Sequence, residues 1–552
     1  MTKMLDALIL KISDFLYMPW VPLFLIAAGV TFTIATRFVQ LRMLRESIRV
    51  VMEKPKTKGG MSSFGALMIS TASRVGTGNI VGVSQAICLG GVGAVFWMWF
   101  IAIFGGASAF VESTLAQIYK RKNPDGSSYG GPSYYMESAL KQRWLGVVFA
   151  VFIILTYAVG YNALASYNLQ SAFAGFGFYD ASVTPMLMGL VLAVLFLVCI
   201  VGGGKRLSKV TGVMVPVMGV IYILVALVIV LLNLGRLPGM FAAILQDAFN
   251  FKAIFGGFTG SCLMYGIKRG LYSNEAGMGS APNAAASADV SHPVKQGLVQ
   301  MLSVFIDTLL ICTATAFMCL LSGVAPAEEL AGAPYVQAAL QNVMGGFGPV
   351  FIAISMTLFA FTTLIGNYYY CEGCLRFILR RQPGKRFMAG FRMVAAVIVF
   401  VGAIASMGLV WNLADLTQGL MVMTNIPVIL LLIKPAVAAL KDYQRQRKAG
   451  QDPVFHAADI GLDGETEFGI DKKDGHWPSF FEFPRFRLCF RSRSPGRRMQ
   501  TDSWGDRKRC VAGHGDSVEW YGFSFLAETG NHSGYTRQIR HAASARFLLR
   551  WL

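Results

Sequence analysis

Two long apolar stretches of this chain are interrupted in the middle by glycine-rich polar sequence. The first covers residues 62–89 and is broken at Arg74-Val-Gly-Thr-Gly-Asn79; the second covers about 255–288 and is broken between Gly266 and Pro282. Peptide groups of an opened helix are costly in hydrocarbon, so such breaks are tolerated only where protein or a water-filled cavity satisfies them. Two breaks at corresponding positions of two halves indicate the binding site of a transporter.

The rest of the sequence has the composition of a polytopic membrane protein. Hydrophobic residues make up 54% of the chain and charged residues only 14%, whereas about 25% of the residues in soluble domains are charged. Apolar runs near the ~20-residue length that spans a bilayer predict about eleven transmembrane helices in an all-α fold: 19–36, 62–89, 92–117, 145–174, 184–201, 210–232, 255–288, 297–321, 347–370, 388–407 and 409–433.

Basic loop residues give the orientation, because short cytoplasmic loops accumulate Lys and Arg. Every second loop carries such a cluster, and one of these clusters groups Lys268 and Arg269 with Lys295. Eleven crossings with this alternation place the amino terminus outside and the carboxyl terminus in the cytoplasm. The loops also account for most of the net charge of +19, so no nucleic-acid partner is predicted.

The two breaks divide the membrane region into two repeats. Without the first span, ten helices remain, and the breaks lie in the first and the sixth. Each break opens a five-helix unit, at about 62–232 and 255–433, and the units cross the membrane in opposite directions, as in many secondary transporters. Residues 1–433 therefore form the predicted transmembrane domain. We expect 434–468 to be a cytoplasmic extension and 469–552 to be a disordered or foreign tail.

Four motifs at and beside the breaks carry a family resemblance. They are Val75-Gly-Thr-Gly-Asn-Ile-Val-Gly82, Gly90-Gly-Val-Gly-Ala-Val-Phe-Trp-Met-Trp99, Tyr129-Gly-Gly-Pro-Ser-Tyr-Tyr135 and Gly266-Ile-Lys-Arg-Gly-Leu-Tyr-Ser-Asn-Glu-Ala-Gly-Met-Gly-Ser-Ala-Pro282. With His292-Pro293 and Asp307-Thr308, they resemble the alanine/glycine:cation symporter family, the sodium:alanine symporters, over about residues 15–468.

The resemblance implies both a fold and a function. The fold is the leucine-transporter-type five-plus-five inverted repeat, with one additional helix before it. The function is sodium-coupled symport of a small neutral amino acid, alanine or glycine, into the cell by alternating access. The location is the plasma (inner) membrane of a bacterium, and the partners are the amino acid, sodium and the lipid bilayer.

The first break contains the groups that a zwitterionic amino acid needs. Half-helix N-termini present free N–H groups with positive partial charge, and glycine lets the backbone approach a ligand closely. We therefore predict that the amides around Gly76 and Gly78 bind the substrate carboxylate, with side-chain hydrogen bonds from Thr77 and Asn79. For Asn79 a structural alternative stands, because an Asn here also caps a half-helix.

A sodium site is implied at the junction of the first and eighth core helices. Sodium prefers oxygen ligands, and unwound helices offer carbonyls. The leucine-transporter-type fold implies carbonyls of Ala72, Val75 and Phe359 with the hydroxyls of Thr362 and Thr363. Threonines in an apolar span ordinarily bond back to the preceding turn, which is the structural alternative. Sodium is the predicted coupling ion, and no other cofactor is predicted.

The second break supplies a further substrate-binding pair, Asn274 and Gly277. Glu275 lies between them and would be costly unpaired in lipid. It is expected either to face an Arg, a Lys or a water-filled vestibule, or to belong only to a cytoplasmic gate network with Lys268 and Arg269. The sequence does not place the unwound point within 266–279.

Three other acids lie near the predicted spans. Asp307 is the best candidate for a coupling or gating carboxylate, although a structural hydrogen bond to a Ser or Thr explains it equally well. Glu112 lies near the predicted cytoplasmic end of its helix, where pairing with a loop cation is expected. Asp415 lies near the outer end of the last helix and is expected at the interface.

Two alternative functions are a cation channel and an integral membrane enzyme. Selective channels often repeat one filter sequence, whereas the two breaks here differ. An enzyme is disfavoured because His292 is the only histidine before residue 450 and no nucleophile and base pair is readable. We therefore expect a transporter and not an enzyme.

Overall fold

Both interrupted stretches fold as pairs of short helices. In the computed structural model, which describes residues 2–467 apart from 56–59, 124–125, 202, 258–259 and 463–465, the first pair is α5 (Ser63–Arg74) and α6 (Val81–Gly90), joined through the 3₁₀ turn η1 (Thr77–Asn79). The second pair is α15 (Cys262–Asn274) and α16 (Ala281–Ala285). The predicted tail at 469–552 lies outside the described residues.

The two broken helices begin in the same way but break differently. A serine caps each N-terminus: Ser62 accepts the Gly65 N–H, and Ser261 accepts the Met264 N–H. The second break is opened by three residues in the left-handed region, Glu275, Gly277 and Gly279, with φ of 55°, 84° and 83°. The second break therefore lies between α15 and α16, at 275–280.

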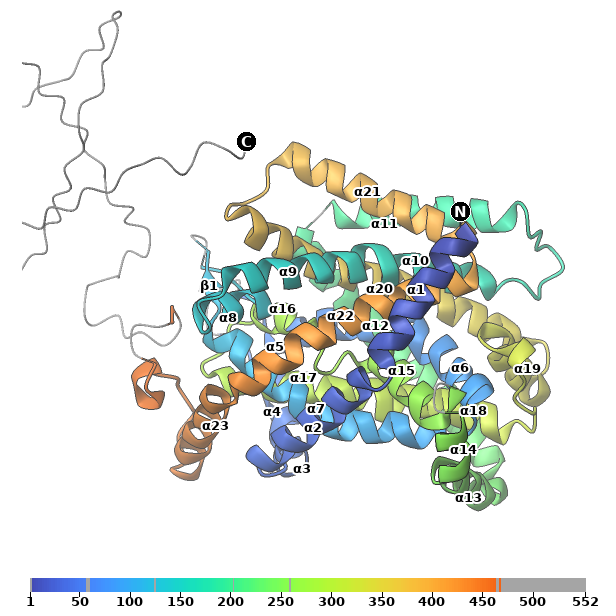
Figure 1. The fold of residues 1–552 in the computed structure, drawn as a ribbon, viewed down its shortest axis with the longest axis horizontal. Helices are drawn as coiled ribbons and strands as arrows, with labels where there is room; N and C mark the ends of the chain where they lie inside the picture. Colours follow the sequence, from blue (N-terminus) through green and yellow to red (C-terminus); the bar gives the residue numbers. More distant parts are fainter. Residues whose placement is uncertain are drawn as a thin grey trace, which may run out of the picture. The chain divides into compact units, whose positions relative to one another are not determined.

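The other core spans are longer helices (Figure 1). Two of them contain π-helical turns. These spans are α7 (Ala94–Ile118), α9 (Arg143–Ile154) continued by η2 (Leu155–Gly160) and α10 (Tyr161–Ser171), α11 (Thr184–Ile200), α12 (Gly203–Leu232), α17 (Pro293–Val304) continued by η5 (Phe305–Cys312) and α18 (Thr313–Leu321), α20 (Phe347–Leu379), α21 (Lys385–Ile404) and α22 (Met407–Leu431).

The number of membrane crossings agrees with the sequence. Among the described residues, 8 helices are long and apolar enough to cross a membrane, and α11 is a shorter apolar helix. The two broken helices complete the eleven predicted crossings, since each half is too short to count alone. The chain is thus an all-α, multi-pass membrane protein.

The helix that precedes the core begins earlier than predicted. The apolar run starts at Pro19, whereas α1 (Thr2–Tyr17) and α2 (Trp20–Ala35) together form one span, Asp6–Ala35. Charged residues within α1 interrupt the apolar run, so hydropathy along the sequence does not extend the predicted span into α1.

Shorter elements lie between and after the spans. They are α3 (Val39–Arg42), α4 (Leu44–Val51), the antiparallel strands β1 (Arg121–Lys122) and β2 (Ser128–Tyr129), α8 (Pro132–Ser138), η3 (Leu234–Arg236), α13 (Leu237–Ala248), α14 (Phe251–Gly256), η6 (Glu328–Leu330), α19 (Ala333–Met344), α23 (Ile433–Lys448) and η7 (Ala457–Ile460). In the strand pair, Arg121 lies opposite Tyr129 and Lys122 opposite Ser128.

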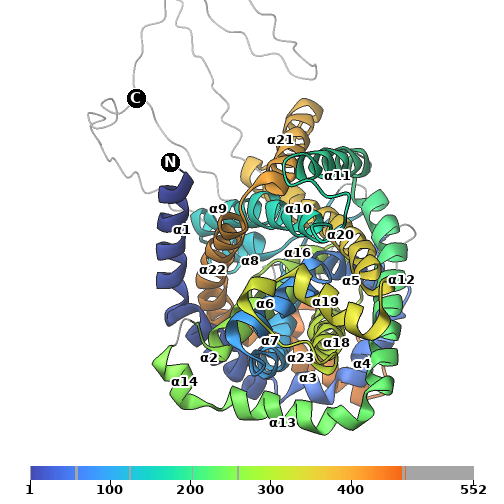
Figure 2. The same ribbon diagram turned by 90° about the vertical axis from the view of Figure 1, so that its right-hand side faces the viewer.

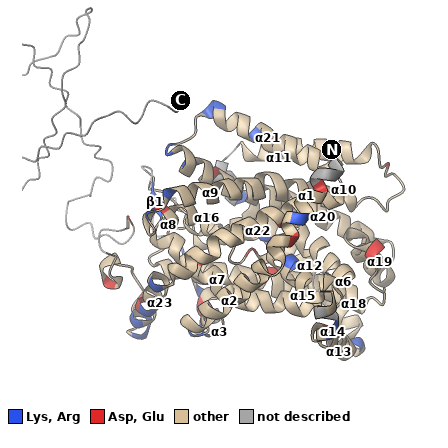
Figure 3. Ribbon diagram, viewed as in Figure 1, with Lys and Arg blue, Asp and Glu red and all other residues tan. Residues whose placement is uncertain are grey.

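The broken helices lie in the interior of the bundle (Figure 2). Burial separates inner from outer helices: 67% of the most apolar window of α7 and of α20 is buried, but only 28% of that of α12. Apolar side chains exposed on α11, α12 and α21 suit contact with lipid. Most of the helical length carries no charge, while Lys and Arg gather on α23 (Figure 3).

Candidate functional site

Asn79 joins the first break to the second. Its side-chain oxygen accepts the Gly76 N–H at 2.8 Å, so it caps the turn. Its side-chain nitrogen donates to Ser273 on α15 at 3.0 Å and to Asp307 Oδ1 on η5 at 2.7 Å. Asn79 is completely buried. The residue predicted for substrate binding or for capping therefore does cap, and it also links three core helices.

Asp307 lies at the same junction. Its Oδ2 accepts hydrogen bonds from Ser273 and Thr308, both at 2.8 Å. The residue is on the π-helical turn η5, and such turns are frequent at functional sites. Its partners Asn79, Ser273 and Thr308 are all neutral. A carboxylate beside two hydroxyls is a set of oxygens that suits a hard cation such as sodium.

Gly76, predicted to bind the substrate, and Thr363, predicted to bind sodium, lie next to each other. A Cβ on Gly76 would collide with the Thr363 hydroxyl, and that hydroxyl is buried without a hydrogen-bond partner in the part of the chain described. Because the Gly76 N–H donates to Asn79, the Ala72 carbonyl one turn earlier loses its usual helical donor. The break thus leaves a free hydroxyl beside Gly76 and a carbonyl without its usual helical donor.

Thr362 has a different environment from its neighbour. Its hydroxyl donates to the carbonyls of Leu358 and Phe359 at 3.0 and 3.1 Å and contacts Met218 of α12 at 3.8 Å. This is the local bonding that threonine ordinarily makes inside a helix. Of the two predicted hydroxyls, only that of Thr363 points to the first break in this conformation.

Thr77 and Gly78 contact residues that the sequence analysis missed. The Thr77 hydroxyl accepts from Asn168 of α10 at 3.1 Å. A Cβ on Gly78 would lie 2.6 Å from the ring of Tyr272. Asn168 is a polar residue within an apolar span, which marks it as a candidate for the site. The sequence does not show which helix its side chain faces.

The second break is held by Glu112, whose expected environment was wrong. Glu112 is completely buried. Its oxygens accept the N–H groups of Gly277 at 3.4 Å and Gly279 at 3.1 Å, and the Asn425 side chain at 3.0 Å. The expected loop cation is not its hydrogen-bond partner, because the unwound backbone supplies the donors instead. Glu112 therefore shapes the loop that contains Gly277.

Asn274 also bonds within this loop. Its side-chain oxygen accepts the Ala276 N–H at 3.0 Å. Its side-chain nitrogen is buried and has no partner among the described residues. Asn274 is therefore the residue of the second break that retains an unused donor for a ligand or water.

Glu275 contacts the first break instead of a loop cation. Its Oε1 accepts the Ser73 hydroxyl at 2.9 Å, its Oε2 accepts the Ser280 hydroxyl at 2.7 Å, and the Nε of Arg74 lies 4.0 Å away. Arg74 is buried, and its Nε and Nη2 have no hydrogen-bond partner within the described chain. Glu275 thus provides a second link between the two broken helices, in addition to the one through Asn79.

Lys268 and Arg269 do not share a loop with Lys295, so the predicted cluster is wrong. Both lie within α15, on the opposite side of the second break from Lys295. Arg269 pairs with both oxygens of Asp415 at 3.2 and 2.9 Å, and both side chains are 5% exposed. Asp415 is therefore buried and paired, not interfacial. Each charge offsets the desolvation of the other, which sequence alone does not reveal.

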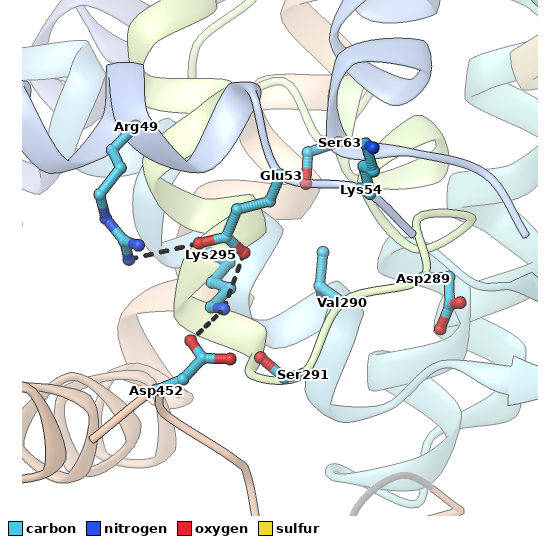
Figure 4. Close-up of a pocket in the computed structure, with 9 residues that line it drawn as sticks. All are labelled: Arg49, Glu53, Lys54, Ser63, Asp289, Val290, Ser291, Lys295 and Asp452. Atoms are coloured by element: carbon cyan, nitrogen blue, oxygen red, sulfur yellow. Dashed lines mark hydrogen bonds and ion pairs between the residues drawn. The ribbon is translucent and has the colours of Figure 1, made fainter. Parts of the chain in front are cut away.

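A separate charged network lies at the end of the bundle that carries α23 (Figure 4). The buried Lys295 ammonium contacts Glu53 at 2.7 Å and Asp452 at 2.9 Å, and Glu53 also contacts Arg49 at 3.3 Å. These residues line a cavity of about 300 Å³ that reaches Ser63 at the start of α5. The network ties the segment after α23 to α17.

Further contacts tie this segment and α23 to the residues directly before α17. The N–H of Phe455 donates to the Ser291 carbonyl at 3.0 Å. His292 lies 3.2 Å from Asp442 of α23, and a hydrogen bond with His292 holds the pKa of Asp442 below its usual range. Burial lowers the pKa of His292. We refer to residues 449–462 as the C-terminal strap.

Replacing Lys295 with Met is expected to loosen the C-terminal strap. The change removes the cation shared by Glu53 and Asp452, and Asp452 is largely exposed, so the expected effect is about fivefold, near the upper range for an exposed ion pair. The measurement is the rate of limited proteolysis within 449–462. Lys441→Met, at an exposed position of α23, is the matched control, and equal cleavage rates in the two variants would contradict the expectation.

The chain is similar to proteins of one family. The model described as the sodium:alanine symporter family matches residues 2–457. The amino-acid carrier protein AlsT of Bacillus subtilis is 46% identical over 478 residues, covering 86% of this chain and 100% of AlsT. The probable sodium/glutamine symporter GlnT of the same organism is 46% identical, covering 83% of this chain and 94% of GlnT.

A more distant relative and a solved structure agree with this result. The sodium/alanine symporter AgcS of Methanococcus maripaludis is 36% identical, covering 80% of this chain and 98% of AgcS. The crystal structure of MhsT in complex with L-phenylalanine superposes with a TM-score of 0.51 at 16% identity, covering 71% of this chain and 93% of MhsT. The likeness to MhsT supports the leucine-transporter-type fold.

Proposed function

The chain belongs to the sodium:alanine symporter family and is a membrane transporter rather than an enzyme, and we propose that it takes up a small neutral amino acid, alanine or glycine, together with sodium by alternating access. The site lies between the two broken helices, in the interior of the bundle. Sodium and substrate favour each other's binding by the same factor, which is what coupling requires.

The observation that carries this proposal is the meeting of both breaks at Asn79, Ser273 and Asp307. The three side chains are completely buried and joined by hydrogen bonds of 2.7 to 3.0 Å. A buried carboxylate with only neutral hydrogen-bond partners calls for a nearby cation. Unwound backbone beside it offers N–H groups to a carboxylate ligand.

We assign separate roles within this region. The N–H groups of Thr77 and Gly78 take the substrate carboxylate, because that of Gly76 is held by Asn79. The unused nitrogen of Asn274 and the loop at Gly277 complete the pocket from the second break.

Sodium is assigned to the opposite side of the first break. Its ligands are the carbonyls of Ala72, Val75 and Phe359 with the hydroxyl of Thr363, and Thr362 joins them after a change of rotamer. Asp307 is the coupling carboxylate. Glu275 and Arg74 belong to the gate on the cytoplasmic side of the site. The unpaired Thr363 hydroxyl supports this sodium assignment most directly.

We further propose that the amino terminus is outside and α23 is cytoplasmic. The basic residues of α23 and of the segment before α5 support this orientation. Domain limits at 1–433 and 434–468 follow from the same arrangement, with repeats at about 62–232 and 255–433.

Uptake into proteoliposomes tests the proposed function. We expect uptake of radiolabelled alanine that requires sodium, is lost when potassium replaces sodium, and is competed by glycine. Competition by D-alanine, serine and glutamine defines the substrate range. Current that flows without substrate would favour a channel, and failure of every neutral amino acid to drive sodium-dependent flux would overturn the proposal.

Thr363→Ala is expected to raise the sodium concentration needed for half-maximal uptake by about 10-fold or more, the loss expected for one hydrogen-bonding group to a charge. The amount of protein in the membrane should remain the same, because the hydroxyl has no protein partner to lose among the described residues. The matched control is Thr357→Ala, on an exposed face of the same helix. An unchanged sodium dependence would remove Thr363 from the site.

A further inference from the structure

Tyr17 connects the helix outside the ten-helix core to the first break. It ends α1 and is 1% exposed. The side-chain nitrogen of Gln418, on α22, donates to its hydroxyl. The side-chain oxygen of Gln418 accepts the hydroxyl of Tyr161, on α10, at 2.6 Å. One buried glutamine amide therefore joins α1 to a core helix.

Three aromatic rings continue this connection to the backbone of the break. The ring of Tyr161 meets that of Tyr272 edge to face at 4.7 Å, and Tyr272 meets Trp411 at 5.2 Å. The Tyr272 ring occupies the space next to Gly78, where a Cβ would lie 2.6 Å away. We call Tyr161, Tyr272 and Trp411 the aromatic layer. It runs from Tyr272, beside Gly78, to Trp411, beside the Arg269 side chain.

An ion pair lies on the other side of the aromatic layer. The Arg269 guanidinium lies 4.1 Å from the centre of the Trp411 ring and pairs with Asp415 of α22. Its neighbour Lys268 places its ammonium 4.7 Å from the centre of the Tyr17 ring and 3.8 Å from Asp14. The helix α1 therefore contacts both helices that carry the ion pair, α15 through Lys268 and α22 through Gln418. Figure 2 shows α1 running beside α22.

We propose that Tyr17 is a positioning residue for the gate formed by the aromatic layer and the Arg269–Asp415 pair. The proposal rests on the proposed transport function. Opening this gate requires α22 to separate from α10 and α15, which breaks the bond between Gln418 and Tyr161 together with the Arg269–Asp415 pair. Tyr17 stabilises the closed state because it fixes the Gln418 amide with its oxygen toward Tyr161. The helix that precedes the core thus sets how often the gate is closed over the site.

The buried position of Gln418 makes this effect measurable. Gln418 is completely buried, so loss of the Tyr17 hydroxyl leaves its nitrogen without an acceptor and free to reorient. Asn412 of α22 donates to Asp6 of α1 at 2.9 Å, so α1 remains attached to α22 in a Tyr17 variant. The substitution therefore acts on the gate contact and not on the docking of the whole helix.

The experiment compares Tyr17→Phe with Tyr368→Phe in the full chain. Tyr368 is also buried and accepts from Arg392 at 2.9 Å, but its hydroxyl faces α21, away from the gate. One readout is the rate at which a membrane-impermeant thiol reagent, added outside, modifies Cys312 as the single remaining cysteine. Cys312 lies 3.2 Å from Asn79 and 3.1 Å from Ser273, at the junction of the two breaks. The second readout is KM against kcat for amino-acid uptake.

Tyr17→Phe is expected to accelerate Cys312 labelling and to raise KM by about 2- to 10-fold, the size of one hydrogen bond, with a smaller change in kcat. Tyr368→Phe should change neither. Adding Tyr17→Phe to Tyr161→Phe should have no further effect, because both substitutions break the same series of hydrogen bonds through Gln418.

Three results would overturn this inference: labelling and KM equal to those of the parent, the same change in Tyr368→Phe, or additive effects in the double variant. These outcomes are separable from failure of the proposed function. If the parent chain shows no sodium-dependent uptake, the labelling rates still report the gate.

Discussion

Glu112→Gln is expected to reduce sodium-dependent uptake by about 10- to 100-fold, although the two side chains have the same shape. The carboxylate of Glu112 accepts from Gly277, Gly279 and Asn425. An amide has one oxygen, so its NH₂ group must face at least one of these donors. Each buried donor left unpaired costs about 1–3 kcal/mol. A cost of this size lowers the population of the loop geometry that Glu112 holds by about the factor expected for uptake.

The measurement is uptake per molecule of protein reconstituted, with size-exclusion chromatography as the check of folding. Glu137→Gln is the matched control. Glu137 lies on α8 and makes partly exposed ion pairs with Arg121 of β1 and Arg143 of α9. We expect it to transport nearly as the parent does, since exposed pairs contribute little. Parental uptake by Glu112→Gln would show that the loop does not depend on the charge.

The location of the first break could be predicted because its glycines all lie together. Gly76 and Gly78 flank Thr77 within a single motif, and the structure opens the helix there. The second break contains more widely spaced glycines with different roles. A Cβ on Gly266 would lie 2.6 Å from the Ala94 carbonyl, so that glycine serves close packing against α7. Among the glycines of the second break, only Gly277 and Gly279 share with Glu275 the positive φ that opens the chain.

Partners of the buried charges could not be predicted, because they lie far apart in the sequence. Glu112 meets the amide of Gly277, and Arg269 meets Asp415. In both cases the cost of burying a charge is offset by a group that is distant in the sequence. Hydropathy along the chain contains no information about such a contact. The same reasoning explains why Lys268 and Arg269 were interpreted as loop residues.

Asn79→Asp is expected to reduce uptake by about 100-fold or more, since it places two carboxylates in contact in the bundle interior, where like charges repel strongly. In the parent, the Asn79 nitrogen lies 2.7 Å from Asp307 Oδ1. The change also removes the donor to Ser273. Uptake and thermal stability in detergent are the measurements.

Adding Asp307→Asn to Asn79→Asp should restore at least about 10-fold of the lost uptake, because it removes the repulsion between the two carboxylates and leaves one coupling carboxylate at this junction, now at position 79. The Asp307 oxygen that faces Asn79 is Oδ1, whereas Ser273 and Thr308 both donate to Oδ2. An amide at 307 can therefore donate to the carboxylate introduced at position 79 while its oxygen keeps both hydroxyl partners. The introduced carboxylate in turn still accepts the Gly76 N–H. Recovered stability without recovered uptake would show that the charge is required at 307 itself, and that Asp307 acts on the cation rather than through Asn79.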